Sequence, residues 1–419
     1  MELVGAVTCW LLVGFVCCQT YVALLFVRVL FRRAPASDGG TPCPKAAVIL
    51  CLRGCDPFLA RVLEGLLDQD YNNYDVWIVV DHRKDPAWQV VEETLRSRPK
   101  AGVHLRALDE PRRTCSLKCS SLVQAIGELD DSYEVVALID ADTIPHRQWL
   151  RQLTAPLVDP QVGAVTGNRW YMPEQISWAV LVRYLWNVGA VVIMSLRHVP
   201  WGGTLAVRTE VFRRCDLLDR WANALCEDVP LYRALGDLKL QVAFVPSLIM
   251  VNRETCDFKY LLHWIGRQVL FMRLYHPAWL PEMAAGVGGA AIMLGGFAIL
   301  PAALLTGHGR LAIWASASLA CFLGLNIAML SLIECGVRRH VRRRGEPTAW
   351  IQPGAIVRIV AAIPLTQVVY AVTLISAMFV REVEWRGVRY GIDRRGRIDL
   401  VEYRPYGLGE SGEKSRDSL

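Results

Sequence analysis

The sequence predicts an α/β protein whose doubly wound, mostly parallel sheet is bracketed by membrane helices. Two observations lead to this fold class. Strand and helix patterns alternate from about residue 46 to residue 276, and long apolar runs both precede and follow that region. Strands that alternate with helices at this spacing imply parallel pairing, and about 20 consecutive apolar residues suffice to span a bilayer.

The composition supports membrane segments and argues against a nucleic-acid partner. Of the 419 residues 53% are hydrophobic and only 21% are charged, and the apolar residues are bunched rather than spread. The net charge of +6 is mild, and many arginines stand beside apolar runs. This placement suits the headgroups of membrane lipids better than a nucleic-acid groove. The 13 cysteines are odd in number and show no paired CxxC spacing, so neither a disulfide framework nor a zinc site follows.

The first segment, residues 1–33, is predicted to be a transmembrane anchor. Its apolar run from Val4 to Leu30 is too long for a signal-peptide core and lacks a basic region in front. Arginines cluster at its end, at positions 28, 32 and 33. Because basic residues stay on the cytoplasmic side, the following domain is expected there, after a linker over 34–45 that is rich in Gly and Pro.

Residues 46–276 are predicted to form the α/β domain. Strands are expected at Ala46–Leu52, Tyr74–Val80, Val103–Ala107, Val135–Ile139, Thr204–Val207 and Gln241–Val245. Asp-Pro pairs at Asp56 and Asp85 predict two helix starts, each with the aspartate as N-cap. The apolar stretch Ile176–Leu196 has the length of a membrane span. A crossing there would put the halves of the sheet on opposite sides of the bilayer, so we expect an interfacial or buried helix.

Three apolar runs of spanning length lie within residues 277–381, at about 283–305, 311–333 and 356–380. A basic loop, Arg338–Arg344, separates the second from the third and is expected to stay cytoplasmic. Three crossings would leave the tail, residues 382–419, on the far side, whereas its arginines favour the cytoplasmic side. Pro364 offers a break into a re-entrant hairpin, and the sequence leaves these alternatives open.

The predicted strand Val135–Ile139 is followed by two carboxylates, Asp140 and Asp142. Open α/β sheets bind ligands at the carboxyl ends of their strands. Two acceptor-only side chains there match a hard divalent ion such as Mn²⁺ or Mg²⁺ that also takes phosphate oxygens. This is the DXD arrangement of nucleotide-sugar glycosyltransferases, although an aspartate at a strand end is also a common cap or turn former.

Further segments resemble one enzyme group. They are Arg53–Pro57, Val80–Ala87, Leu117–Cys119, Glu227–Asp228 and Glu384–Tyr390. Together they resemble a family-two inverting glycosyltransferase with a GT-A fold, most closely the ceramide glucosyltransferase group. The resemblance covers about residues 44 to 275 and, more loosely, the apolar runs after them.

The resemblance implies roles for individual residues. Asp81 would contact uracil, with Arg53 and Lys118 also on the nucleotide side. Asp140 would be a ribose or metal-side contact, and Asp142 the principal metal ligand. Asp228 would be the general base, next to Glu227 in the Glu-Asp motif.

One element departs from the pattern. The family carries Gln or Arg, two further residues, then Arg-Trp, whereas this chain reads Trp264-Ile265-Gly266-Arg267-Gln268. Arg267 can still bind a diphosphate bidentately. Trp264, one turn earlier on the same helix face, is the candidate to replace the missing tryptophan.

These observations predict transfer of a sugar, glucose by resemblance, from a UDP-sugar to a membrane lipid hydroxyl such as that of ceramide. The stretch Ile176–Leu196 lies between the metal site and the base and is placed to admit acyl chains. Diacylglycerol or a polyprenyl or hopanoid lipid would fit the same logic, as would a bacterial inner membrane or a Golgi membrane. A processive polysaccharide synthase is the alternative, and a transporter or membrane scaffold with an unused domain is a third.

Overall fold

The computed structural model describes residues 2–32, 43–348 and 353–406. Most of the expected linker, Arg33 and the end of the expected tail lie outside the described residues. The centre of the molecule is a seven-stranded sheet in the order β3-β2-β1-β4-β6-β5-β7. Its strands are β1 Ala46–Leu52, β2 Tyr74–Val80, β3 Val103–Ala107, β4 Val135–Ile139, β5 Val162–Tyr171, β6 Thr204–Arg208 and β7 Gln241–Asn252.

The sheet is mostly parallel, as predicted. Only β6 runs antiparallel to its neighbours, β4 and β5. β5 was not predicted; it pairs in parallel with β7, and every one of its residues is buried. Successive side chains of a strand point to opposite faces. In β1, Ala47 and Ile49 therefore join one hydrophobic cluster and Val48 and Leu50 another, which explains why this central strand is apolar throughout.

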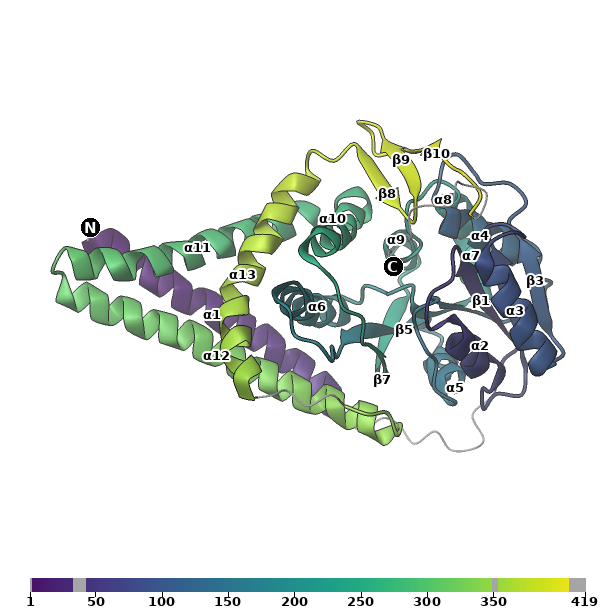
Figure 1. The fold of residues 1–419 in the computed structure, drawn as a ribbon, viewed down its shortest axis with the longest axis horizontal. Helices are drawn as coiled ribbons and strands as arrows, with labels where there is room; N and C mark the ends of the chain where they lie inside the picture. Colours follow the sequence, from purple (N-terminus) through teal and green to yellow (C-terminus); the bar gives the residue numbers. More distant parts are fainter. Residues whose placement is uncertain (1, 33–42, 349–352, 407–419) are drawn as a thin grey trace.

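Helices cover both faces of the sheet (Figure 1). They are α2 Leu59–Leu67, α3 Pro86–Ser97, α4 Leu117–Gly127, α5 Trp149–Thr154, α6 Trp178–Leu196, α7 Thr209–Arg214, α8 Leu217–Trp221, α9 Asp228–Asp237 and α10 Phe258–Tyr275, with a 3₁₀ turn at Ala155–Val158. The N-cap prediction is confirmed for Asp85, whose side chain accepts a hydrogen bond from the Ala87 amide at 2.8 Å. It is wrong for Asp56, because α2 begins later and the Asp56 carboxylate instead pairs with Arg386 at 2.7 Å.

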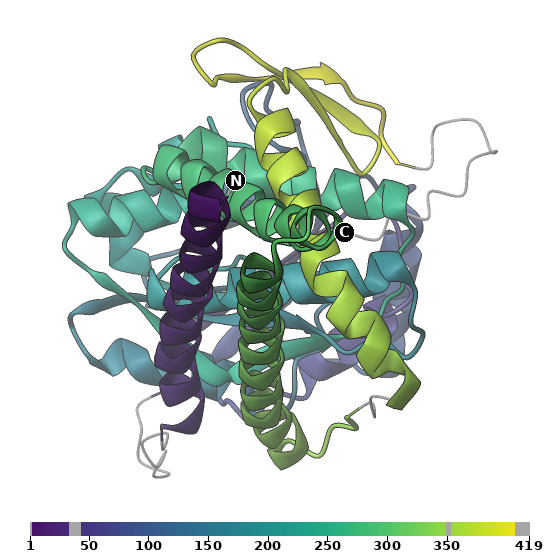
Figure 2. The same cartoon turned by 90° about the vertical axis from the view of Figure 1, so that its left-hand side faces the viewer.

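Five described helices are long and apolar enough to cross a membrane: α6 and the helices α1 Glu2–Phe31, α11 Trp279–Leu305, α12 Gly309–Arg343 and α13 Pro353–Ala377. α1, α11 and α12 extend together away from the sheet (Figure 1), and α1 and α12 run side by side (Figure 2). α6 differs from them because most of its residues are buried, between the sheet strand β5 and α13.

α13 differs from the re-entrant hairpin that the sequence offered as an alternative. It is one continuous helix with Pro364 inside it, not a hairpin, and it packs along α6 and α10. Before it, Arg344 donates a hydrogen bond to the Ile249 carbonyl of β7 at 2.9 Å. After it, Arg273 of α10 donates to the Val380 carbonyl at 3.0 Å. The end of α12 and the segment after α13 are therefore both held by the same α/β domain.

Residues 382–402, expected to lie in a basic tail, form a second sheet with strands β8 Glu382–Trp385, β9 Val388–Ile392 and β10 Ile398–Glu402. Arg386 and Gly387 connect β8 to β9 and both have positive φ, at 50° and 70°. A two-residue hairpin loop with two positive φ angles is the type I′ turn. Val388 and Tyr390 are buried in the core of the α/β domain, and the Leu117 amide donates to the Tyr390 hydroxyl at 3.1 Å. This packing carries the hairpin tip to the carboxyl ends of β1 and β4.

Candidate active site

The two aspartates after β4 lie beneath one guanidinium. Asp140 is 9% exposed and Asp142 is 4% exposed. Nη2 of Arg169, near the end of β5, lies 3.3 Å from Asp140 Oδ2 and 2.8 Å from Asp142 Oδ1. Sequence analysis missed Arg169 because it did not predict β5. The one available signal was an arginine that follows shortly after an apolar stretch.

Lys118, near the start of α4, joins two other residues that the sequence singled out. Its Nζ lies 2.6 Å from Asp140 Oδ1 and 2.6 Å from Glu227 Oε1. Glu227 is thereby engaged in an ion pair and is 3% exposed. Two carboxylates surround this single ammonium, so Lys118 fixes the position of both acids rather than presenting an unpaired charge.

The paired aspartates differ in their electrostatics. Burial disfavours the charged form of Asp140, but Lys118 and Arg169 outweigh it and lower the pKa of this carboxyl. For Asp142 burial dominates and raises the pKa to about 7, although Arg169 acts against it. A further cation beside Asp142 would stabilise the ionised form of this carboxyl.

One oxygen of the aspartate pair is open to a divalent ion. Asp142 Oδ2 is buried and has no hydrogen-bond partner among the described residues, so one lone-pair site is open. Within the described ranges no group of three or more His, Cys, Asp or Glu side chains could hold a metal. An ion here would therefore have two protein carboxylates and would need further oxygens, as a diphosphate supplies.

Asp228 is the first residue of α9 and, unlike Glu227, is only half-buried. Its side chain lines the larger of two cavities at the site. It accepts a hydrogen bond from the next amide, Val229 N, at 2.8 Å. Desolvation and the nearby Glu227 charge raise the pKa of Asp228 to about 6, with Lys118 acting in the opposite direction. A carboxylate that exchanges protons near neutral pH and faces a cavity suits a general base.

Arg267 and Trp264 lie on α10 and both line the larger cavity. The Arg267 guanidinium lies over the ring of Trp385, 4.9 Å from its centroid, and its Nε is buried with no hydrogen-bond partner among the described residues. Trp264 instead contacts Tyr171 and Trp186 edge to face. The tryptophan that Arg267 contacts therefore comes from the β8 hairpin, and the substitution of Trp264 for the missing tryptophan stays a prediction.

Asp81 is held within the protein. Arg53 forms an ion pair with it, and the Tyr403 hydroxyl and the Tyr406 amide each donate a hydrogen bond to it at 2.9 Å. Arg53 also donates to the Arg404 carbonyl at 3.0 Å. Both oxygens of Asp81 therefore already accept hydrogen bonds from within the protein, two of them from the segment 403–406.

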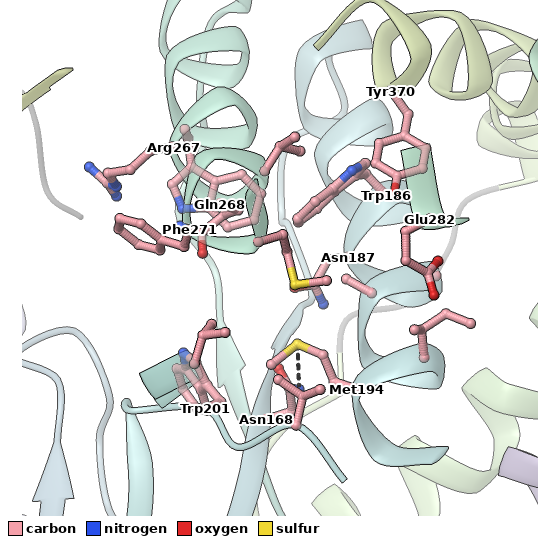
Figure 3. A pocket seen from close by; sticks show the side chains of 18 of the residues that line it. Asn168, Trp186, Asn187, Met194, Trp201, Arg267, Gln268, Phe271, Glu282 and Tyr370 are labelled. Atoms are coloured by element: carbon pink, nitrogen blue, oxygen red, sulfur yellow. Dashed lines mark hydrogen bonds between the residues drawn. The ribbon is translucent and has the colours of Figure 1, made fainter. Parts of the chain in front are cut away.

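Two cavities meet at these residues. The smaller, about 60 Å³, is lined by Arg53, Asp81 and Arg386. The larger, about 400 Å³, is lined by Asp228 and Arg267 and continues to the helices of membrane-spanning length (Figure 3). Lys118, Asp140 and Trp385 line both. The site thus has a compact compartment on the α/β domain and a wide one that reaches the apolar helices.

A mostly parallel sheet with paired aspartates after its central strand, and a Glu-Asp pair opening a later helix, is the arrangement of a glycosyltransferase of GT-A type. The model of glycosyl transferase family 21 matches residues 8–398, and the chain belongs to that family. The family includes ceramide glucosyltransferases, so the resemblance to that group is confirmed. The matching family is number 21 rather than family two. No curated protein matches the chain.

One solved structure supports the fold, and a second is less similar. A mannosyltransferase from Pyrobaculum calidifontis, solved with GDP-mannose and Mn²⁺, is similar over 90% of this chain and 99% of its own, with a TM-score of 0.52 and 16% identity. Glucosyl-3-phosphoglycerate synthase from Mycobacterium tuberculosis, solved with Mn²⁺, UDP and glucosyl-3-phosphoglycerate, aligns over 58% of this chain and 83% of its own, with a TM-score of 0.37 and 14% identity.

Proposed function

We propose that this glycosyltransferase moves a sugar, glucose by its resemblance to the ceramide glucosyltransferase group, from a UDP-sugar to the hydroxyl of a membrane lipid such as ceramide. The observation that carries the proposal is the larger cavity. Its wall includes Asp228, Lys118 and Asp140 at one end and Phe15, Gly286 and Leu374, from α1, α11 and α13, at the other. A soluble acceptor needs no such continuity with helices of membrane-spanning length.

The donor would bind across the two compartments. The smaller cavity, beside Arg53 and Asp81, would take the nucleoside, and Asp142 with Asp140 would hold a divalent ion against the diphosphate. Such an ion supplies charge neutralisation for the leaving group. The Arg267 guanidinium has unfilled hydrogen-bonding capacity and would donate to diphosphate oxygens.

Asp228 would remove the proton from the acceptor hydroxyl as its oxygen attacks the anomeric carbon. With Asp228 as the base, direct displacement is the simplest course and would invert the anomeric configuration. Glu227 and Lys118 would position the base by holding the start of α9 against Asp140.

The membrane arrangement follows from the basic residues and from α13. We propose that residues 46–276 form the catalytic domain on the cytoplasmic side, with α1, α11 and α12 crossing the bilayer. The basic stretch Arg338–Arg344 ends α12 on the domain's side, where Arg344 binds β7. α13 would then lie along the membrane surface between the domain and the spans.

The test is transfer of labelled sugar from UDP-glucose to a mixed lipid extract by the purified full chain in detergent, with Mn²⁺ or Mg²⁺ and with Asp228→Asn as the blank. A metal-dependent, organic-soluble product absent from the blank supports the proposal. Label in a water-soluble polymer would favour a processive polysaccharide synthase. No labelled product from any UDP-sugar would overturn the proposed function.

A further inference from the structure

One face of α6 forms part of the wall of the larger cavity. Trp186, Gly189, Ala190 and Ile193 all line the cavity, and their spacing of three, four and seven residues places them on one side of the helix. Figure 3 shows Trp186 on α6 across the cavity from Gln268 and Phe271 on α10. The smallest member of this face is Gly189, in the middle of a helix of 19 residues.

Gly189 has no structural reason to lack a side chain. A Cβ placed there would meet no heavy atom within 4 Å. Gly286 and Gly289 of α11 are different, because a Cβ at either would lie 2.4 Å from Leu374 or 2.5 Å from Phe15. Those two glycines allow helices to pack closely, whereas Gly189 leaves empty space.

A glycine inside a helix destabilises the helix relative to alanine. Gly189 is not among the residues with positive φ, so no turn requires it. The space that it leaves belongs to the cavity, which also contains the base Asp228. The glycine therefore widens the cavity at this point of the α6 wall.

The position of this wall relative to the reacting groups is fixed. Asn187, two residues before Gly189, donates a hydrogen bond from Nδ2 to the Arg169 carbonyl at 2.9 Å. Arg169 in turn contacts both paired aspartates. A side chain added at residue 189 would therefore enter the cavity rather than push α6 away from the site.

We propose that Gly189 is a specificity-determining residue that leaves room for the long N-acyl chain of the acceptor lipid to pass along α6. The inference rests on the proposed function, since it assumes an acceptor hydroxyl at Asp228. A hydroxyl held there leaves the rest of the lipid in the larger cavity, whose far wall is made by α1, α11 and α13. The Gly189 face is the side of α6 that a hydrocarbon chain would follow.

The test compares full-length Gly189→Ala, Gly189→Val and Gly189→Leu proteins with two acceptors of the same headgroup, one with a long and one with a six-carbon N-acyl chain. We expect kcat/KM for the long-chain acceptor to fall progressively with side-chain size, by about tenfold or more in Gly189→Leu relative to the short-chain acceptor. UDP affinity should be unchanged, because residue 189 does not line the smaller cavity.

Gly14→Leu is the matched control. Gly14 is also a helical glycine with nothing within 4 Å of a Cβ, but it lies on α1 and does not line the cavity. It should leave the ratio of long-chain to short-chain activity unchanged. A Gly189 series with a constant ratio would overturn the inference while the proposed function stands. Failure of the wild-type protein to modify any lipid would overturn the proposed function and this inference together.

Discussion

The Tyr403 hydroxyl lies 2.9 Å from Asp81 Oδ1, although 322 positions separate the two residues in the chain. Asp81 follows β2 of the α/β domain, and Tyr403 follows β10 of the C-terminal sheet. The carboxylate predicted to contact a nucleobase is therefore bound by the protein's own C-terminal segment. Donor binding and the position of this segment should be coupled.

Replacing Tyr403 with Phe should tighten UDP binding, because it removes one of the donors that a nucleobase must displace from Asp81. The gain should be about fivefold, which corresponds to a net hydrogen bond of about 1 kcal/mol. Isothermal titration with UDP measures it. In an Asp81→Asn background the Tyr403 effect should shrink, and an equal effect in both backgrounds would contradict direct competition.

Replacing Asp142 with Asn should remove metal-dependent transfer, by at least about a hundredfold, because the carboxylate with the open oxygen is lost. Transfer measured against Mn²⁺ concentration, together with the melting temperature, separates this effect from unfolding. Wild-type transfer that persists in excess chelator would rule out the metal role.

Replacing Asp228 with Asn should retain UDP binding and lose transfer by about 10²–10⁴-fold, the usual contribution of a general base. The amide keeps the size of the side chain but cannot take the proton. Equilibrium UDP binding and single-turnover transfer provide the two measurements. Loss of UDP binding in this variant would indicate that Asp228 only caps α9.

The rate should depend on pH through the same group. The pKa of Asp228 is raised to about 6 by desolvation and by Glu227, so the carboxyl is protonated below that pH and cannot act as a base. At saturating metal, kcat/KM should fall about tenfold per pH unit below pH 6 and level off above it. A profile that is flat between pH 5 and 7.5 would contradict the assignment.

Replacing Trp264 with Ala should weaken acceptor use more than UDP binding. Trp264 lines only the larger cavity, where it contacts Trp186 of α6 edge to face. We expect KM for the acceptor to rise about tenfold while UDP affinity changes little. Trp88→Ala, on α3 and away from both cavities, is the control. A loss confined to UDP affinity would place Trp264 on the donor side.

Local patterns were sufficient for much of the fold. Continuous apolar runs predicted β1, β2 and β4, and the Asp85-Pro86 pair predicted the start of α3. β5 escaped prediction because Asn168, Arg169 and the tryptophan and tyrosine after them interrupt its apolar pattern, although all of these side chains are buried. The C-terminal sheet escaped because its arginines conceal an alternating strand pattern, in which only Val388, Tyr390 and Ile392 of β9 face the core.

The sequence by itself determined the paired aspartates after the central strand, the glycosyltransferase family and the apolar helices, because these depend on residue types within short windows. Only the tertiary structure decided that Arg169 bridges the aspartates, that Trp385 lies beneath Arg267 and that α13 returns the chain to the domain. Each of these depends on a contact between segments far apart in the chain. Such contacts are selected by how the whole core packs, and no local propensity encodes them.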